Sequence, residues 1–247
     1  MLCRSRWLWH LLYGDLMDKR LLSIATKIPD GKGFVDVGTD HGYLPIYMLD
    51  HGYKGKVIGS DINEDPLNCA VRNAEKAAYE DKIRFILCDG LDEGVSDDVD
   101  TIVIAGMGGD TICGILDRAE WCMDSRYRII MQPMSKAEIL RFWLSYNDFE
   151  IVEESFLDDN GTLYQIITAI YGKRCTLSDA ELFVGRYELS SKETHYNRVL
   201  ADAKLKFERL IKGLSHSDKN EDIVRCNFSR QILDELYELE RKGGELI

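Results

Sequence analysis

Residues 33–47 read GFVDVGTDHGYLPIY: a short apolar run, a loop with two glycines, and then a helix-like stretch. Gly38 and Gly42 allow the backbone to turn sharply and to pass close to a ligand. Further apolar runs with little polar alternation follow at 56–61, 82–88, 99–105 and 127–132. Runs of this kind are typical of parallel strands that are covered on both faces.

Helix-like stretches lie between these runs, at 43–51, 65–79, 111–123 and 135–146. Ser135 followed by Glu138 fits a capping box at the start of the last stretch. Two more strand-like runs, 149–156 and 162–170, flank the hairpin signal DDNG, so we expect the final strand to be antiparallel. Repeated strand–helix–strand units predict an α/β fold, a Rossmann-like doubly wound sheet of seven mostly parallel strands.

The chain after residue 172 reads as helix alone. Apolar residues recur at spacings of three and four through two stretches, 177–213 and 221–242. Two such stripes pack against each other as an antiparallel, coiled-coil-like hairpin. We therefore expect a sheet domain at 17–172 and a C-terminal α-helical hairpin domain at 173–247. The hairpin is a structural cap or a dimer-forming arm, so we expect a monomer or a weak homodimer.

Residues 1–16, MLCRSRWLWHLLYGDL, superficially resemble a signal sequence because basic residues precede an apolar stretch. The stretch is short, contains His10 and leads to Gly14 without a small-residue cleavage pattern. We therefore interpret residues 1–16 as an upstream extension, with Met17 as the start of the folded protein.

The composition excludes several classes of protein. Of the 247 residues, 45% are hydrophobic and 30% are charged, with 31 Lys plus Arg against 43 Asp plus Glu. That apolar fraction excludes global disorder, and no window approaches the roughly 18–20 apolar residues of a membrane helix. The net charge of −12 argues against nucleic-acid binding, because affinity for phosphates depends on Lys and Arg.

The seven scattered Cys form no CxxC pair, which is typical of reduced thiols, so we expect a cytoplasmic protein. The five His are isolated, without HxH or HxxxH spacing, and we expect no metal site.

Acidic residues and glycines collect where successive strands end. They are Asp36, Gly38, Asp40 and Gly42 after the first strand, Asp61 at the second, Asp89 and Gly90 at the third, and Ala105, Gly106, Met107 and Gly108 at the fourth. Because the carboxyl ends of parallel strands meet at one sheet edge, we expect a single ligand cleft there. The first loop lacks GxGxxG spacing and a Walker lysine, which disfavours pyrophosphate binding. Asp61 can accept two hydrogen bonds from a ribose diol, or it can cap the next helix.

These motifs together resemble a known family. The stretches DVGTDHGYLPIY, SDINEDPLNCA, CDGLDEG, VIAGMGGDTICGIL and MQP are similar to those of the bacterial tRNA (adenine(22)-N1)-methyltransferases, which are class I S-adenosylmethionine-dependent enzymes. The similarity runs from about residue 19 to residue 172 and continues more loosely through the helical tail. Asp40 replaces the middle glycine of the general methyltransferase pattern, and AGMGG replaces Asn/Asp-Pro-Pro-Tyr. Both departures match the narrower family.

The resemblance implies S-adenosylmethionine as cofactor and N1 of adenine 22 of tRNA as methyl acceptor. It implies that Asp36 binds the cofactor and that Gly38, Asp40 and Gly42 surround its methionine group. It places Asp61, Ile62 and Asn63 at the ribose and adenine, and Asp89 and Gly90 at the adenine amine. It places Ala105, Gly106, Met107 and Gly108 beside the sulfonium and the incoming base.

Methyl transfer to N1 of adenine depends mainly on in-line placement of the reactants. The product base is cationic, so a nearby carboxylate stabilises the charge that develops in the transition state. Asp40 is our candidate for that role, or for a base that removes a proton from N6. His41 orients Asp40, contacts the target or anchors the loop, and Tyr43 stacks on a base or packs at a helix start. The target base must leave the tRNA fold, because N1 lies on its Watson–Crick edge.

The excess of acid lies entirely in the sheet domain. Residues 1–172 hold 17 basic and 29 acidic side chains, residues 173–247 hold 14 of each, and residues 173–217 hold nine basic against six acidic. A second basic group lies near the fourth and fifth strand ends: Arg118, Arg126, Arg128, Lys136 and Arg141. We expect the tail to grip the RNA backbone while the sheet domain performs the chemistry, although a charge run is more often a solvated face.

Two other functions stay open on the residues alone. The same fold can methylate a small molecule or a protein, with the helical tail as a lid or a dimer contact. The chain can also be a non-catalytic S-adenosylmethionine-binding protein that uses its hairpin to hold a partner.

Overall fold

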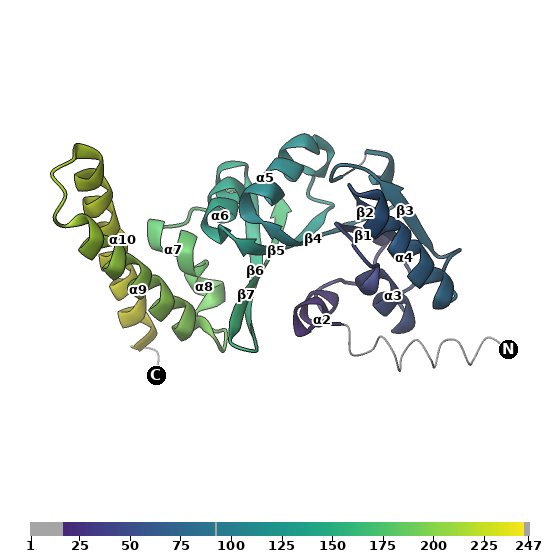
Figure 1. The fold of residues 1–247 in the computed structure, drawn as a ribbon, viewed down its shortest axis with the longest axis horizontal. Coiled ribbons are helices and arrows are strands. Elements are labelled where there is room, and N and C mark those ends of the chain that lie inside the picture. Colours follow the sequence, from purple (N-terminus) through teal and green to yellow (C-terminus); the bar gives the residue numbers. More distant parts are fainter. Residues whose placement is uncertain (1–16, 92, 245–247) are drawn as a thin grey trace.

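The computed structural model describes residues 17–91 and 93–244 and contains a seven-stranded sheet with helices on both faces (Figure 1). The predicted extension at 1–16 lies outside the described residues. The strand order is β3-β2-β1-β4-β5-β7-β6. The strands are β1 (Gly33–Val37), β2 (Lys56–Asp61), β3 (Ile83–Leu87), β4 (Thr101–Gly108), β5 (Arg128–Ser135), β6 (Phe149–Asp159) and β7 (Thr162–Tyr171).

The sheet confirms the predicted doubly wound arrangement. Strands β3, β2, β1, β4 and β5 are parallel to one another, whereas β7 is antiparallel to both β5 and β6. The predicted hairpin therefore joins the last two strands. All five residues of β1 are buried, as expected for a central strand between two layers of helices.

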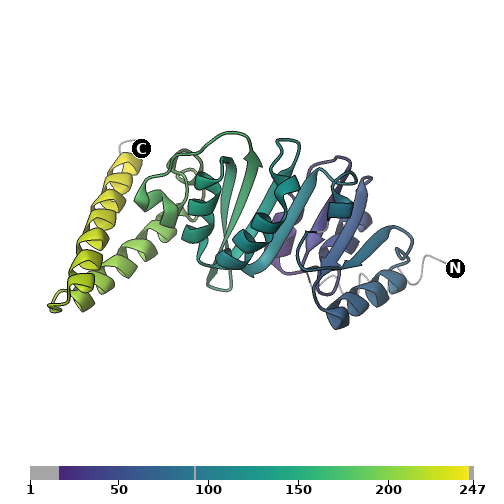
Figure 2. The same ribbon diagram turned by 90° about the horizontal axis from the view of Figure 1, so that it is seen from above.

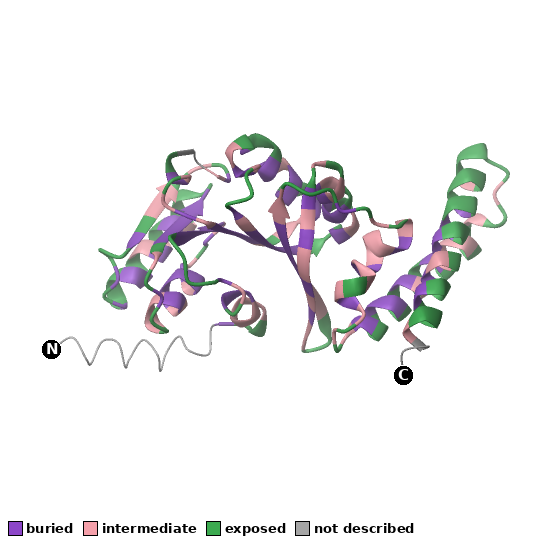
Figure 3. Cartoon of the chain, turned by 180° about the vertical axis from the view of Figure 1, so that it is seen from behind, coloured by how far each residue is buried: buried purple, intermediate pink, exposed green. Residues whose placement is uncertain are grey.

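Within the described residues, five helices and two short 3-10 turns surround the sheet. They are α2 (Lys19–Ala25), α3 (Tyr43–Asp50), α4 (Glu64–Lys76), α5 (Gly109–Arg118), α6 (Ala137–Tyr146), η2 (Glu93–Val95) and η3 (Glu120–Cys122). Alternate strand residues face opposite layers. Phe34 packs in one core with α2, α3 and α4, while Val35 packs in the other with α5 and α6. Burial on both faces explains why the strands lack polar alternation (Figure 3).

The chain beyond the sheet forms four helices and not two. They are α7 (Asp179–Val184), α8 (Tyr187–Ser190), α9 (Tyr196–Leu214) and α10 (Asn220–Gly244). The hairpin of α9 and α10 is confirmed, and it lies at one end of the molecule, beyond β6 and β7 (Figure 2). The prediction of one helix over 177–213 is wrong, because Gly185 ends α7 in a left-handed conformation with φ +90. A Cβ at this position would lie 2.3 Å from Ser190 Oγ, so only glycine fits the break.

The ends of β4 and β5 also differ from the prediction. Both strands run about three residues further, and Met107 pairs with Pro133 and Gly108 with Ser135 across a register irregularity. The glycine-rich segment 106–108, which we expected after the end of the fourth strand, is therefore part of β4. The predicted capping box at Ser135 is wrong, because Ser135 belongs to β5 and Lys136, at φ +56, precedes α6 without a side-chain cap.

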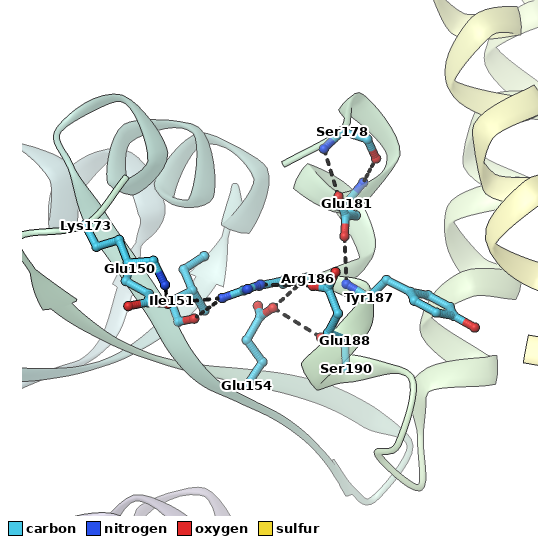
Figure 4. Close-up of polar contacts among 10 residues, drawn as sticks. All are labelled: Glu150, Ile151, Glu154, Lys173, Ser178, Glu181, Arg186, Tyr187, Glu188 and Ser190. Atoms are coloured by element: carbon cyan, nitrogen blue, oxygen red, sulfur yellow. Dashed lines mark hydrogen bonds and ion pairs between the residues drawn. The ribbon is translucent and has the colours of Figure 1, made fainter. Parts of the chain in front are cut away.

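A buried charge cluster joins the sheet to the helical tail. Glu154 of β6 accepts hydrogen bonds from Arg141 Nε at 2.7 Å, from the Arg186 backbone N–H at 2.5 Å and from Ser190 Oγ at 3.1 Å. The side chains of Arg141 and Glu154 are both 0% exposed. The Arg186 guanidinium crosses back to the Ile151 carbonyl at 3.1 Å (Figure 4). The first helices of the tail are thus fixed to the sheet by hydrogen bonds to a desolvated ion pair.

Candidate functional site

The loop after β1 passes three times through left-handed backbone conformations. Gly38, Asp40 and Gly42 have φ values of +74, +52 and +71. The N–H groups of Gly38 and Thr39 both donate to the Ser60 carbonyl, at 2.8 and 2.9 Å, which ties this loop to the end of β2. The backbone thereby turns sharply at the carboxyl edge of the sheet, where ligands of open α/β sheets bind.

Asp40 is the one non-glycine residue among these three. Its N–H donates to Asp61 Oδ2 at 3.2 Å, and its own carboxylate is 64% exposed. A left-handed conformation is unfavourable for a residue with a Cβ and persists where the surroundings enforce it, often at functional sites. Asp is among the few residues with a Cβ that adopt this conformation readily, and the hydrogen bond to Asp61 holds it there.

A first cavity of about 380 Å³ opens beside this loop. The predicted residues Asp36, Gly38, Asp40, Tyr43, Ala105 and Gly106 line it, together with Asp18, Arg20, Leu21, Thr39 and Leu44. The structure therefore brings together residues from the ends of β1 and β4, as predicted. Asp18 and Arg20 of the N-terminal segment were missed, because a short Asp-Lys-Arg sequence carries no signal that it will fold back onto a strand end.

Arg20 is held in place by three hydrogen bonds. Its Nε and Nη2 donate to Asp18 Oδ2 at 3.3 and 3.2 Å, and its Nη1 donates to Gln132 Oε1 at 3.1 Å. Asp18 also caps α2 through the Leu21 N–H at 2.7 Å. Gln132, 0% exposed, accepts in addition from the Gly106 N–H at 3.2 Å. The guanidinium, the turn in β4 and the end of β5 thus form one connected unit.

Asp36 is buried at the base of the first cavity. Burial raises the pKa of this carboxyl to about 6, because the charged form loses hydration. The Thr39 hydroxyl, which donates to Asp36 Oδ2 at 2.9 Å, and the nearby charge of Arg20 oppose the rise in pKa. A cationic ligand in this cavity would favour the ionised form of Asp36.

A second cavity of about 570 Å³ lies at the ends of β2 and β3. The predicted residues Asp61, Ile62, Asn63, Asp89, Gly90 and Met107 line it, together with Asp110 and Arg118 among others. Asp61 accepts from the Asn63 N–H at 2.9 Å and from the Asp40 N–H, which leaves further lone pairs for a ligand. Asp89 pairs with Arg118 at 2.9 Å on the rim.

Gly38 belongs to the walls of both cavities. A Cβ on Gly38 would lie 2.4 Å from Met107 Cε, so the methionine methyl group packs directly onto the glycine. The single cleft expected from the sequence is therefore present as two adjoining cavities that meet at Gly38.

Three predicted residues do not line either cavity. His41 lies beside the loop, where its Nδ1 is 3.1 Å from Cys69 Sγ of α4 and its Nε2 is 3.6 Å from Asp40 Oδ1. Gly42 precedes α3, and its missing Cβ would lie 3.1 Å from Ala70 Cβ. Gly108 precedes α5. The contact of His41 with α4 agrees with the loop-anchoring alternative.

The predicted basic group at the strand ends is not a single surface. Arg141 is fully buried against Glu154, so it does not belong to any basic surface. Arg128 begins β5 and Arg126 precedes it, which places both at the opposite edge of the sheet. Arg118 and Lys136 do lie at the carboxyl edge, paired with Asp89 and Asp110. The predicted strand at 127–132 already places residues 126 and 128 at its start, away from the carboxyl edge.

Two further classes of site find no support in the described residues. Within 17–91 and 93–244, no three His, Cys, Asp or Glu side chains gather closely enough to hold a metal ion. In the same part of the chain, no helix is both long and apolar enough to cross a bilayer.

Comparison with known proteins relates the chain to methyltransferases. A family model described as a methyltransferase domain matches residues 17–167. The tRNA (adenine(22)-N(1))-methyltransferase of Bacillus subtilis (strain 168) is 35% identical over 159 residues, which are 64% of this chain and 66% of that enzyme. The aligned region therefore spans about two thirds of the length of this curated relative.

Solved structures show the same similarity over nearly the whole described chain. The crystal structure of the B. subtilis m1A22 tRNA methyltransferase TrmK superposes with a TM-score of 0.80 at 26% identity, and covers 90% of this chain and 98% of that chain. A putative tRNA (m1A22) methyltransferase of Streptococcus pneumoniae, in complex with S-adenosyl-L-methionine, superposes with a TM-score of 0.74 at 29% identity and covers 90% of this chain and 99% of that chain. The shared architecture thus includes the helical tail.

Proposed function

The chain belongs to the tRNA (adenine(22)-N1)-methyltransferase family of methyltransferase-domain proteins, and from that premise we propose that it transfers a methyl group from S-adenosylmethionine to N1 of adenine 22 in tRNA. The observation that carries the proposal is the pair of cavities that meet at Gly38, with Asp61 in one and with Asp40 beside Gly106 in the other. This arrangement places a nucleoside-binding acid next to a second, more polar chamber.

The residues present fit S-adenosylmethionine. Asp61 keeps acceptor sites for a ribose diol at the end of β2, and Asp89 lies across the same cavity for the adenine amine. The Arg20 guanidinium uses three of its five N–H donors on Asp18 and Gln132, so two stay available for the cofactor carboxylate. Asp36, Gly38 and Ala105 would border its ammonium end. The bound cofactor supplies an electrophilic methyl group on a sulfonium.

The chain's own groups orient the acceptor and stabilise charge. Gln132 fixes the Gly106 turn by accepting its N–H at 3.2 Å, which sets the floor on which an adenine would lie. Asp40, exposed in the first cavity, lies where a carboxylate can stabilise the cationic product. Tyr43 lines the same cavity and would contact the extruded base, while His41 keeps the loop in position through Cys69.

The helical tail would hold the RNA while the sheet region performs the chemistry. Lys192, Arg209 and Lys212 are exposed and make no ion pair within the described residues, so their charges are available to phosphates. We assign residues 17–172 to catalysis and residues 173–247 to RNA contact, in a monomer or a weak homodimer. A tRNA substrate and free thiols suit a cytoplasmic enzyme.

Methylation of unmodified tRNA tests the proposed function. The protein, incubated with labelled S-adenosylmethionine and a tRNA transcript that carries adenine 22, should form 1-methyladenosine on nucleoside analysis. A transcript with guanine at position 22 is the matched control and should accept no label. Asp61→Ala should abolish cofactor binding in calorimetry. Absence of 1-methyladenosine with the wild-type protein would reject the proposed acceptor.

A further inference from the structure

A third cavity of about 300 Å³ lies between the sheet and the helical tail, and the site described above does not include it. We call it the junction groove and define it by Met134, Lys136, Gln165, Phe183, Ala203 and Lys206. These residues come from the end of β5, the turn before α6, β7, α7 and α9. The groove therefore exists only because the tail is fixed against the sheet.

The junction groove lies on the same edge of the sheet as the methyl-transfer site. Residues 162–166 of β7 extend past the last β5 partner, Met131, so Gln165 stands beyond the paired part of β5. Gln132 links the two places directly: its Oε1 accepts from Gly106, and its Nε2 lies 3.6 Å from Met134 Sδ. Strands β4 and β7 are separated by β5, which corresponds to about 10 Å across the sheet. That separation suits a nucleotide next to the target.

Gln165 presents a hydrogen-bond donor of fixed direction to this groove. Its Oε1 accepts from Arg141 Nη2 at 2.7 Å. A guanidinium can only donate, so the amide oxygen must face Arg141 and the Nε2 must face away from it. This Nε2 has no hydrogen-bond partner within the part of the chain that the structure describes. Arg141 is itself held by the buried Glu154, so the orientation of the Gln165 amide is set before any ligand arrives.

The remaining walls combine apolar surface with exposed cations. Met134 is 53% exposed, and Phe183 and Ala203 contribute apolar atoms from the tail. Lys206 Nζ lies 4.8 Å from the Phe183 ring centroid and 3.6 Å from Glu138, and Lys136 pairs with Asp110 at 2.6 Å. Both ammonium groups are about half exposed, so a phosphate can compete for them at small cost.

We propose that the junction groove binds an unpaired nucleotide adjacent to the target adenosine, with its base against Met134 and Phe183, a base acceptor atom on Gln165 Nε2, and its phosphates near Lys136 and Lys206. This inference rests on the proposed function. It identifies a second, sequence-reading contact with the RNA, because a donor of fixed direction favours bases whose acceptor atom lies at the matching position on the base edge.

The test compares Gln165→Glu with the wild-type protein. Glutamate keeps the acceptor for Arg141 but turns the groove-facing donor into a negatively charged acceptor, so the fold is retained while the nucleotide contact is lost. We expect kcat/KM for tRNA to fall at least tenfold and the Kd for S-adenosylmethionine to stay within twofold. Lys206→Gln, which removes one of the two exposed cations of the groove, should change kcat/KM in the same direction, and Lys54→Gln, on a distant loop, should have no effect.

Modified substrates separate this inference from the proposed function. One transcript carries an abasic nucleotide beside adenine 22, on the side that occupies the groove. With the wild-type protein, its kcat/KM should be as far below that of intact tRNA as the kcat/KM of Gln165→Glu is with intact tRNA. Gln165→Glu acting on the abasic transcript should lose no more kcat/KM than either change causes alone. If the wild-type protein methylates intact tRNA and both groove variants have the same kcat/KM as the wild-type protein, the groove assignment is overturned and the proposed function stands. A wild-type protein that forms no 1-methyladenosine would overturn both.

Discussion

Asp40 occupies a backbone conformation that its Cβ makes unfavourable, at a position where general class I methyltransferases have glycine. Its N–H is held by Asp61 and its carboxylate is exposed to the first cavity. A glycine would adopt this conformation with less strain, so we predict that the carboxylate itself has a role. Asp40→Gly and Asp40→Asn separate these contributions, because both residues tolerate φ near +52 while neither carries charge.

We predict that both Asp40 variants lose activity without losing the fold. Relief of strain and the added chain entropy of glycine oppose each other, so the free energy of unfolding should change by less than about 1 kcal/mol. The kcat should fall by about 100-fold, as when a group that stabilises transition-state charge is removed, and the Kd for S-adenosylmethionine should change much less. Urea denaturation, calorimetry and methylation rates measure the three quantities. Full kcat in Asp40→Asn would show that the charge is not used.

Asp36 makes the stability of the protein depend on pH. Burial raises the pKa of this carboxyl from 3.8 to about 6 in the folded state. The folded protein therefore binds a proton more tightly than the unfolded chain, and stability from this group is lost as the pH rises through about 4 to 6. The cost above pH 6 is on the order of 3 kcal/mol.

Asp36→Asn should remove this pH dependence. The variant should be more stable than the wild-type protein at pH 7.5, and the difference should disappear near pH 4, where the wild-type carboxyl is protonated. Urea unfolding at the two pH values measures the difference. A wild-type protein that gains no stability between pH 7.5 and pH 5 relative to the variant would contradict the raised pKa.

At the scale of elements, α7 and α8 connect the sheet to the hairpin through charge and not only through apolar packing. Glu154 lies in β6, yet its partners come from α6 and from the segment that begins α8. Phe156 of the same strand packs in one cluster with Val184, Tyr196 and Leu236 of the tail. The position of the hairpin, and with it the junction groove, therefore depends on this strand.

We predict that Glu154→Gln destabilises the protein by about 3–5 kcal/mol, because it leaves the buried guanidinium of Arg141 without a counter-charge. Lys173→Gln removes a partner of Glu150 from an exposed pair, in which the lysine is 72% exposed, and should cost less than about 0.5 kcal/mol. Urea denaturation followed by tryptophan fluorescence compares the two variants. Equal stability of both would show that Glu154 is not the main contact.

At the scale of the molecule, the whole excess of acidic side chains lies before residue 173, whereas the tail carries equal numbers of acidic and basic side chains. Many tail cations are neutralised locally: Lys204 pairs with Glu240, Arg186 with Glu188, and Arg198 with Asp158. The cations without such partners are fewer than the sequence count suggests. Affinity for tRNA should therefore be moderate and sensitive to salt.

We predict that the triple variant Lys192→Gln, Arg209→Gln and Lys212→Gln weakens tRNA binding and reduces its salt dependence. Each phosphate contact contributes about 0.7–0.9 to the slope of log K against log salt concentration, so the slope should decrease by about 2 to 3. Binding titrations at several salt concentrations measure it, with Lys54→Gln as the control. An unchanged slope would place the RNA on another surface.

The sequence by itself determined where the strands of the sheet lie along the chain and which site residues follow them. Apolar runs without alternation, and acids or glycines at the end of each, sufficed to predict the sheet and the placement of Asp36, Gly38, Asp61 and Asp89 at one edge. These features are local: burial on both faces imposes the apolar runs, and a left-handed turn requires residues such as Gly38 that accept it. Local signals are readable without knowing which segments meet.

Only the tertiary structure decided which distant side chains share a cavity or an ion pair. Arg141 looks like a surface cation in sequence, yet it is buried, because its partner Glu154 lies on another strand. Arg20 joins the site through Gln132, 112 residues away, and Gln165 faces the tail only because Arg141 orients it. Such pairings are set by chain crossings and by desolvation in the folded core, neither of which leaves a periodic pattern along the chain.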